Sequence, residues 1–255
     1  MNELVAIAQR LRQAVDGLVF SAPVTHVYNP LHYAWEPHRR YIERYGQQRP
    51  RQVLLVGMNP GPWGMAQTGV PFGEVGLARD WLGLEAPVGK PQRQHAKRPV
   101  NGFACTRSEV SGARLWGAAR RCFGTPEHFF GQFFVYNYCP LLFLEDSGRN
   151  RTPDKLSASE RAPLWRACDQ ALRDVIAYFA PEFVVGIGKF AEGRIRAVCA
   201  TEAPKVGAIL HPSPANPKAN QNWVAEATRQ LHALGIALPE SGAPPPDCAR
   251  GEAAG

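Results

Sequence analysis

The sequence predicts an α/β protein built on a mostly parallel sheet of four strands. Two observations carry this prediction: the chain contains short apolar runs bounded by turn residues, and these runs alternate with helical patterns. The four runs span residues 53–56, 133–136, 183–188 and 206–210. Short continuous apolar runs are typical of buried strands, and their alternation with helices favours a mostly parallel sheet.

Helical patterns lie around and between these strands. Apolar residues spaced for one helix face occupy 2–19, and a second helix is predicted from Ser111 to a stop at Gly124. Ser157 and Glu160 form a capping-box pattern that opens a long helix ending before Pro181. A last helix contains Trp223 and ends at Gly235. Residues 22–50 are rich in proline and in aromatic side chains that are expected to pack against a core, and residues 146–153 are predicted to form a long polar loop.

The overall composition limits the class of protein. The chain has 255 residues, of which 45% are hydrophobic, enough for a substantial core. We expect one domain over residues 1–238 and a disordered tail over 239–255, where proline, alanine and glycine dominate. No apolar run approaches the ~18 residues of a membrane span, and no secretory signal is recognisable. We therefore expect a cytoplasmic protein, nucleoid-associated in a bacterium or nuclear in a eukaryote.

Charge and cysteine usage narrow the choice of partner. The formal net charge of +7 favours a polyanionic partner. Residues 87–107 contain several cations and no acidic residue, so they form either a solvated face or a phosphate-contacting surface. The six cysteines are scattered, with no CxxC pair and no finger-type spacing to histidine. We expect neither a metal nor another cofactor.

The stretch after the first strand is the strongest local indication of a site. Strand 53–56 breaks into a loop of glycine and proline from which one polar side chain, Asn59, projects. Pro60 and Pro62 restrict this loop, and Gly61 lets a ligand approach its backbone closely. On this stretch alone, a ligand site and an ordinary strand-to-helix connection are equally good interpretations.

Two other strands also end in polar residues, Asn137 and His211. In parallel sheets, ligands bind beyond the carboxyl ends of the strands, so Asn59, Asn137 and His211 are expected to converge. Taken singly, each residue is equally well explained as a turn former or a structural side chain. Three such strand ends on one sheet edge favour a functional site.

These residue types permit a specific chemistry. An amide such as Asn137 both donates and accepts, and so matches the N3–H and O4 edge of a pyrimidine. Phe72 can stack on a flat ring, and His211 can donate to an oxygen that gains negative charge. Asn59 can hold a water but is too weak a base to deprotonate it. A site without a carboxylate suits a reaction in which the leaving group departs before water attacks.

Two long stretches, Gly57–Val75 and His211–Asn220, resemble the two signatures of the single-strand-selective monofunctional uracil-DNA glycosylases. The similarity continues in order from Leu18 to Leu234. It includes the stretches 28–39, 97–100, 108–114 and 137–150. The resemblance implies a three-layer αβα fold of the uracil-DNA glycosylase type. It also implies a monomeric enzyme that flips uracil, or 5-hydroxymethyluracil, out of single- or double-stranded DNA and excises it to initiate base excision repair.

The resemblance assigns roles to individual residues. Asn59 would position the hydrolytic water and His211 would stabilise the departing uracil anion. Asn137 would recognise the base and Phe72 would stack on it. The backbone of Met58 and Gly61 would line the pocket.

The segment after His211 would wedge into the DNA, and a polar loop would assist it: Ser213, Pro214, Ala215, Asn216, Pro217, Arg149 and Asn150. The sequence departs from the family at Ala215, where arginine is frequent. Either the wedge is weaker than in the family, or Arg149 and Arg151 share its work. Trp63 replaces a more usual phenylalanine.

Two other functions stay open at the level of sequence. One is a glycosylase acting mainly on xanthine or hypoxanthine, since the Asn137 amide can rotate to present either edge. The other is a DNA-binding module with a vestigial pocket, which the basic residues would serve equally well.

Overall fold

A computed structural model describes residues 2–199 and 204–239. Its centre is a parallel sheet of four strands, β2 (Val53–Gly57), β3 (Phe133–Asn137), β6 (Phe183–Ile187) and β7 (Lys205–Ile209). The strand order is β3-β2-β6-β7, and every neighbouring pair is parallel. The predicted four-stranded sheet is thus confirmed. The predicted tail begins at residue 239, and its residues after Pro239 lie outside the described ranges.

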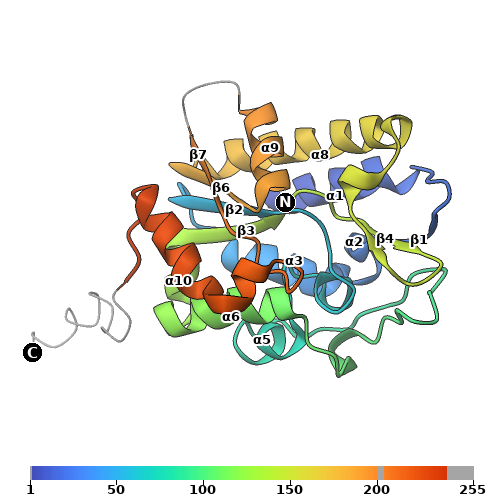
Figure 1. Cartoon of the computed structure of the whole chain (residues 1–255), viewed down its shortest axis with the longest axis horizontal. Coiled ribbons are helices and arrows are strands. Elements are labelled where there is room, and N and C mark those ends of the chain that lie inside the picture. Colours follow the sequence, from blue (N-terminus) through green and yellow to red (C-terminus); the bar gives the residue numbers. More distant parts are fainter. Residues whose placement is uncertain (1, 200–203, 240–255) are drawn as a thin grey trace, which may run out of the picture.

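Helices cover both faces of this sheet and make the three αβα layers that were predicted (Figure 1). Helices α8 (Ala158–Phe179) and α9 (Lys189–Val198) lie on one face, with α1 (Glu3–Asp16) packed against α8. Helices α6 (Val110–Phe123) and α10 (Pro217–Ala233) lie on the other face. All residues of β2 and β6 are buried, as expected of strands covered on both sides.

Local sequence fixes where the helices begin and end. At the start of α8 both bonds of the capping box form, and the Ser157 amide donates to the Glu160 carboxylate over 2.9 Å. The helix stops at Ala180, which adopts a left-handed backbone before Pro181. Gly124 and Gly235 follow α6 and α10 with φ of +71° and +86°, as their predicted role as stops requires.

The predicted polar loop 146–153 contains a strand, which corrects the sequence interpretation, and further regular elements lie where none was predicted. Strands β1 (Val24–Tyr28), β4 (Leu142–Glu145) and β5 (Asn150–Arg151) form a second, antiparallel sheet in the order β1-β4-β5. Residues 22–50 also hold α2 (Pro30–Tyr33) and α3 (Trp35–Tyr45). Helix α9 was not predicted either. The strands among these elements are short, and pairing with distant segments stabilises them.

The remaining elements are short connections: α4 (Met65–Thr68), α5 (Val75–Asp80), α7 (Pro126–Gln132) and two 3₁₀ turns, Gly102–Ala104 and Pro153–Lys155. Two glycines at the end of β6 leave their positions without side chains. A Cβ on Gly186 would lie 2.4 Å from the Glu192 nitrogen, and one on Gly188 3.2 Å from Cβ of His211. Helix α9 and the segment after β7 therefore approach the sheet edge closely. Of the helices within the described ranges, none has the length and hydrophobicity needed to cross a bilayer.

Candidate active site

A cavity of about 480 Å³ opens at the carboxyl edge of the parallel sheet. Residues that follow β2, β3 and β7 line it together with the start of α6. Most of the predicted site residues meet here: Met58, Asn59, Gly61, Phe72, Asn137, Asn150, His211, Ser213 and Pro214. The strand ends at Asn59, Asn137 and His211 thus converge, as their positions in the sequence predicted.

Asn137 ends β3 and is only 5% exposed. Its Nδ2 donates to the Met65 sulfur over 3.2 Å, whereas its Oδ1 is buried without a hydrogen-bond partner among the described residues. A Cβ on Gly57 would lie 2.4 Å from this Oδ1 and 2.5 Å from the Phe72 ring. Glycine at 57 therefore lets the amide and the ring lie side by side, with a free acceptor beside a flat apolar surface.

Phe72 is held rigidly. Its φ of +53° is unusual for a residue with a side chain, and its carbonyl lies so close to α6 that a Cβ on Gly112 would be 2.1 Å away. The centroids of the Phe72 and His211 rings are 6.2 Å apart. Backbone strain of this kind is typical of ligand sites and is maintained only by the surrounding packing. The ring thus forms one fixed wall of the cavity.

His211 follows β7, and its protonation state can be inferred from its contacts. The Ser213 amide donates to Nδ1 over 3.1 Å, so Nδ1 carries no hydrogen. Burial lowers the pKa of His211 below its usual value of 6.5, so the ring is neutral at pH 7. Its single proton then lies on Nε2, which is available as a donor.

The Asn59 amide is oriented by the backbone on which it lies. Its Nδ2 donates to the carbonyl of Leu141 over 3.2 Å, and a longer contact of 3.4 Å reaches the carbonyl of Pro60. With the nitrogen engaged in this way, Oδ1 remains as an acceptor. This geometry suits an amide that holds a water by one of its hydrogens.

Glu109 corrects the expectation that the site contains no carboxylate. It lines the same cavity, and its carboxyl lies directly against Gly61 and Gly64: a Cβ on either glycine would be within 1.7 Å of one of its oxygens. Burial, reinforced by the nearby negative charge of Glu74, raises the pKa of Glu109 from 4.5 to about 7. The carboxyl is thus partly protonated at neutral pH, and its buried Oε2 has no partner among the described residues.

Sequence reasoning missed Glu109 because nearly fifty positions separate it from the loop that it contacts. It occupies the N-cap position of α6, where serine, threonine, aspartate or asparagine is the usual residue. Its side chain makes no capping hydrogen bond and turns toward the cavity instead. The sequence signal was confined to the resemblance of 108–114, which assigned it no role.

The predicted wedge residues divide into two groups. Ser213, Pro214 and Asn150 line the cavity, and the buried Oδ1 of Asn150 has no partner within the described chain. Ala215, Asn216 and Pro217 do not line it; Asn216 caps α10 by accepting from the Lys218 amide over 3.1 Å. Arg149 is exposed outside the cavity.

Arg114 is a second residue to which the sequence assigned no role. It reaches from α6 to the segment after His211, donating over 2.9 Å both to the Pro212 carbonyl and to the Asn220 side chain. Asn220 in turn donates to the Pro214 carbonyl over 2.8 Å. These bonds brace residues 212–214 against α6. Within residues 2–199 and 204–239, no group of three histidine, cysteine or acidic side chains is placed to hold a metal.

Comparisons with known proteins agree with this fold and cavity. The family model of the uracil DNA glycosylase superfamily matches residues 43–232, and the chain belongs to that superfamily. Among its relatives, the single-strand selective monofunctional uracil DNA glycosylase of Bos taurus is 53% identical over 229 residues, covering 89% of this chain and 84% of that protein. The corresponding protein of Rattus norvegicus is 51% identical, with 89% and 82% covered.

A solved structure confirms the architecture. The crystal structure of wild-type SMUG2 from Pedobacter heparinus matches with a TM-score of 0.64 and covers 90% of this chain and 98% of that one. At 18% sequence identity, this likeness establishes the fold alone.

Proposed function

We propose that this protein is a monofunctional DNA glycosylase that excises uracil, and also 5-hydroxymethyluracil, from DNA. One observation carries the proposal: a free amide oxygen, a flat aromatic wall and a neutral imidazole donor meet in one cavity, on Asn137, Phe72 and His211. The relatives at 51–53% identity are named for excision of this base.

Asn137 and Phe72 account for recognition of the base. The unpaired Oδ1 of Asn137 accepts from the N3–H of uracil, which would satisfy a buried acceptor that the protein leaves without a partner. The ring of Phe72 stacks on the base. Because the target atoms of a stacked base are inaccessible, the nucleotide must first leave the helix, at a cost of a few kcal/mol.

His211 and Asn59 account for the chemistry. As the bond from the base to the sugar breaks, negative charge accumulates on the base, and Nε2–H of His211 donates to its oxygen. The sugar is left as a cation that a weakly activated water can capture, so Asn59 needs only to orient that water. In its protonated form, which is partly populated at neutral pH, Glu109 adds no negative charge to a cavity in which an anion forms.

The finer points of the proposal concern the form of the substrate and of the enzyme. Ser213, Pro214 and Asn150 lie at the cavity where a flipped nucleotide would enter, which supports a role in holding the DNA. The enzyme is proposed to act as a monomer, on single strands and on duplexes, in the cytoplasm or, in a eukaryote, in the nucleus. Single strands are favoured to the extent that an unpaired base costs less to expose.

Excision from synthetic oligonucleotides tests the proposal. The expected result is an abasic site at a single uracil, in single strands and opposite guanine, with no covalent adduct trapped by borohydride. Parallel substrates contain xanthine or hypoxanthine, because the Asn137 amide is held only by a weak sulfur acceptor and can rotate. Faster release of either purine than of uracil would overturn the assignment of uracil as substrate. A protein that binds DNA and releases none of these bases would be the binding module instead.

A further inference from the structure

Trp63 lies at the rim of the cavity and carries two arginine side chains over its ring. The guanidinium carbon of Arg107 is 4.6 Å from the ring centroid and that of Arg98 is 5.4 Å away. The indole is itself anchored, because it packs on the small apolar cluster of Val75, Phe103 and neighbouring residues. Such contacts hold a planar guanidinium in place while leaving its N–H edge free.

Neither arginine is neutralised in the part of the chain that the structure describes. Arg98 donates only to the neighbouring Lys97 carbonyl, and its Nε is buried, so the free donors of Arg98 are on its terminal nitrogens. No hydrogen bond or ion pair of the Arg107 side chain is found among these residues. Arg107 is exposed. Both belong to the basic run 87–107, for which the sequence left open whether it is a solvated face or a phosphate-contacting surface.

A second tryptophan in the same chain provides the contrast. Trp165 also carries two arginines, Arg161 at 5.2 Å and Arg194 at 4.2 Å. There, however, Arg194 forms an ion pair with Asp169, and Arg161 donates to the Asp154 carbonyl over 3.0 Å. The two arginines over Trp165 bond to other groups of the protein. The two arginines over Trp63, in contrast, have donors without a protein partner among the described residues, beside the cavity.

We propose that Arg98 and Arg107, oriented by Trp63, bind consecutive phosphates of the DNA strand next to the nucleotide whose base enters the cavity. This inference rests on the proposed function, because it places the DNA substrate of that function on the rim of the cavity. It makes Arg98 and Arg107 binding residues and Trp63 a positioning residue.

The spacing of the two arginines suits this role. Their distances to the shared ring centroid add up to 10.0 Å, which is the largest separation that the two guanidinium carbons can have. A strand carries one phosphate about every 3.4 Å of duplex axis, so two guanidinium groups within this limit can contact consecutive phosphates. The hairpin that carries Arg149 adjoins the same surface, since a Cβ on Gly148 would lie 3.6 Å from the Arg98 guanidinium carbon. The proposed phosphate-binding surface is thus continuous with that hairpin.

The salt dependence of DNA binding tests the proposal. The probe is an oligonucleotide containing 2′-fluoro-deoxyuridine, which resists hydrolysis, as a single strand and as a duplex. Each lost phosphate contact lowers the slope of log K against log salt by about 0.7 on single strands and about 0.9 on duplexes. The double variant Arg98→Gln, Arg107→Gln is therefore expected to lose about 1.4 on single strands and about 1.8 on duplexes.

A Trp63→Leu variant separates orientation from charge. It keeps both cations, so the salt slope should be unchanged while affinity falls about tenfold, and Trp63→Phe should recover most of that affinity. Circular dichroism establishes that each variant is folded. A loss of slope in Trp63→Leu equal to that of the double variant would overturn the positioning role.

Arg161→Gln is the matched control, because it removes an arginine that lies over Trp165. It should leave the slope unchanged. The proposal fails if the double variant keeps the wild-type salt slope. It also fails if Arg161→Gln lowers the slope as much as each arginine of the double variant does. A wild-type protein that excises uracil while the double variant keeps its slope contradicts this inference alone. A wild-type protein that excises nothing contradicts the proposed function.

Discussion

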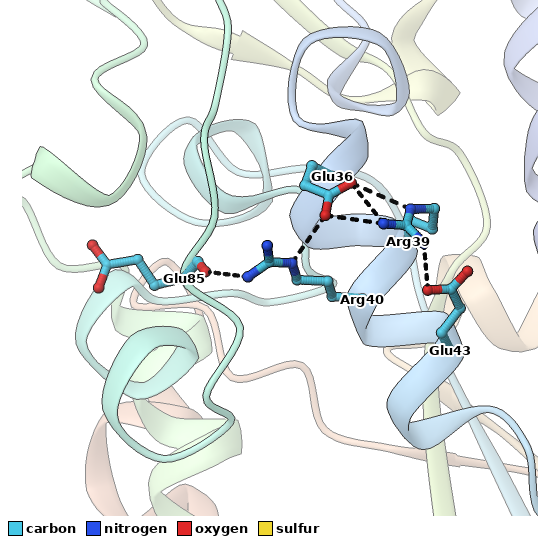
Figure 2. Close-up of polar contacts among 5 residues, drawn as sticks. All are labelled: Glu36, Arg39, Arg40, Glu43 and Glu85. Atoms are coloured by element: carbon cyan, nitrogen blue, oxygen red, sulfur yellow. Dashed lines mark hydrogen bonds and ion pairs between the residues drawn. The ribbon is translucent and has the colours of Figure 1, made fainter.

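Two arginine-rich regions of this protein use the same residue type differently. On α3, Arg39 contacts Glu36 and Glu43 at 3.0 and 2.6 Å, and Arg40 contacts Glu36 at 3.0 Å and the Glu85 carbonyl at 2.9 Å (Figure 2). At the rim of the cavity, Arg98 and Arg107 lie over Trp63 and contact no carboxylate of the described residues. Net charge alone does not separate these regions, although only one of them has donors left for a ligand.

The difference indicates where the positive charge of the chain acts. An arginine whose donors are satisfied by carboxylates three or four positions away stabilises its own helix by a few tenths of a kcal/mol. An arginine without an anionic partner beside a substrate cavity adds to the local potential instead. The comparison assigns chemistry to the cavity, binding to its rim, and helix stability to α3. Substitutions in each region should therefore affect different measurements.

The largest expected effect is on chemistry inside the cavity. His211→Ala removes the Nε2–H donor and should lower the excision rate by about 10²–10³, the usual cost of one such donor. Binding to an uncleavable oligonucleotide should change little, and His211→Asn, which keeps an N–H donor, should recover part of the rate. Equal losses of rate and binding would mean that the cavity and its rim are not separable.

The next effect is the pH dependence that Glu109 imposes. Its pKa is raised to about 7, so the carboxyl is neutral below that pH and becomes negative above it. Negative charge opposes formation of the uracil anion, so the excision rate should fall roughly an order of magnitude between pH 6.5 and 8.5. His211, whose pKa is lowered below 6.5, stays neutral throughout this range.

Glu109→Gln provides the control, because a neutral amide cannot ionise. Its pH–rate profile should be flat over the same interval. The stability of the fold gives an independent measurement. The pKa of Glu109 is higher in the folded protein than in the unfolded chain, so the free energy of unfolding falls as pH rises from 4.5 to 7, by at most about 3 kcal/mol. Urea denaturation at these two pH values should show this loss in the wild type and not in Glu109→Gln. An unchanged profile in the variant would remove Glu109 from the explanation.

A substitution of Arg114 should have a smaller effect on the excision rate, and this residue is intermediate between the cavity and the rim arginines. It lies near the cavity, yet its donors are used inside the protein, on the Pro212 carbonyl and on Asn220. Arg114→Gln should therefore lower the single-turnover rate about fivefold by loosening the segment after His211, because small misplacements reduce rates. The salt slope of DNA binding should be unchanged. A reduced slope with an unchanged rate would class Arg114 with the rim arginines.

The smallest effects are expected on α3. Arg39→Gln removes contacts with two glutamates and Arg40→Gln a contact with one, and exposed pairs of this kind contribute less than about 1 kcal/mol. Thermal denaturation should show a shift of a few degrees at most. DNA affinity, its salt slope and excision should all match the wild type. A lower salt slope in either variant would show that α3 contacts DNA as well.

Much of this architecture could be predicted from the sequence. The four parallel strands are short, apolar and bounded by glycine or proline, so local pattern identifies them. Asn59, Asn137 and His211 could be placed together because parallel strands end at one edge of the sheet. Beyond that rule, contacts between distant segments decide the details. Strand β1 pairs with β4 more than a hundred residues away, and Glu109 approaches Gly61 only after α6 has packed against the sheet.

Three oxygens in the cavity have no protein donor among the described residues: Asn137 Oδ1, Asn150 Oδ1 and Glu109 Oε2. Leaving a buried polar atom unsatisfied costs about 1–3 kcal/mol, so the empty enzyme is less stable than its packing would allow. A ligand that satisfies these atoms should therefore raise the melting temperature by more than contact area alone predicts. Conversely, Asn137→Leu should give a more robust and inactive protein, because the fold sacrifices stability to remain ready for its substrate.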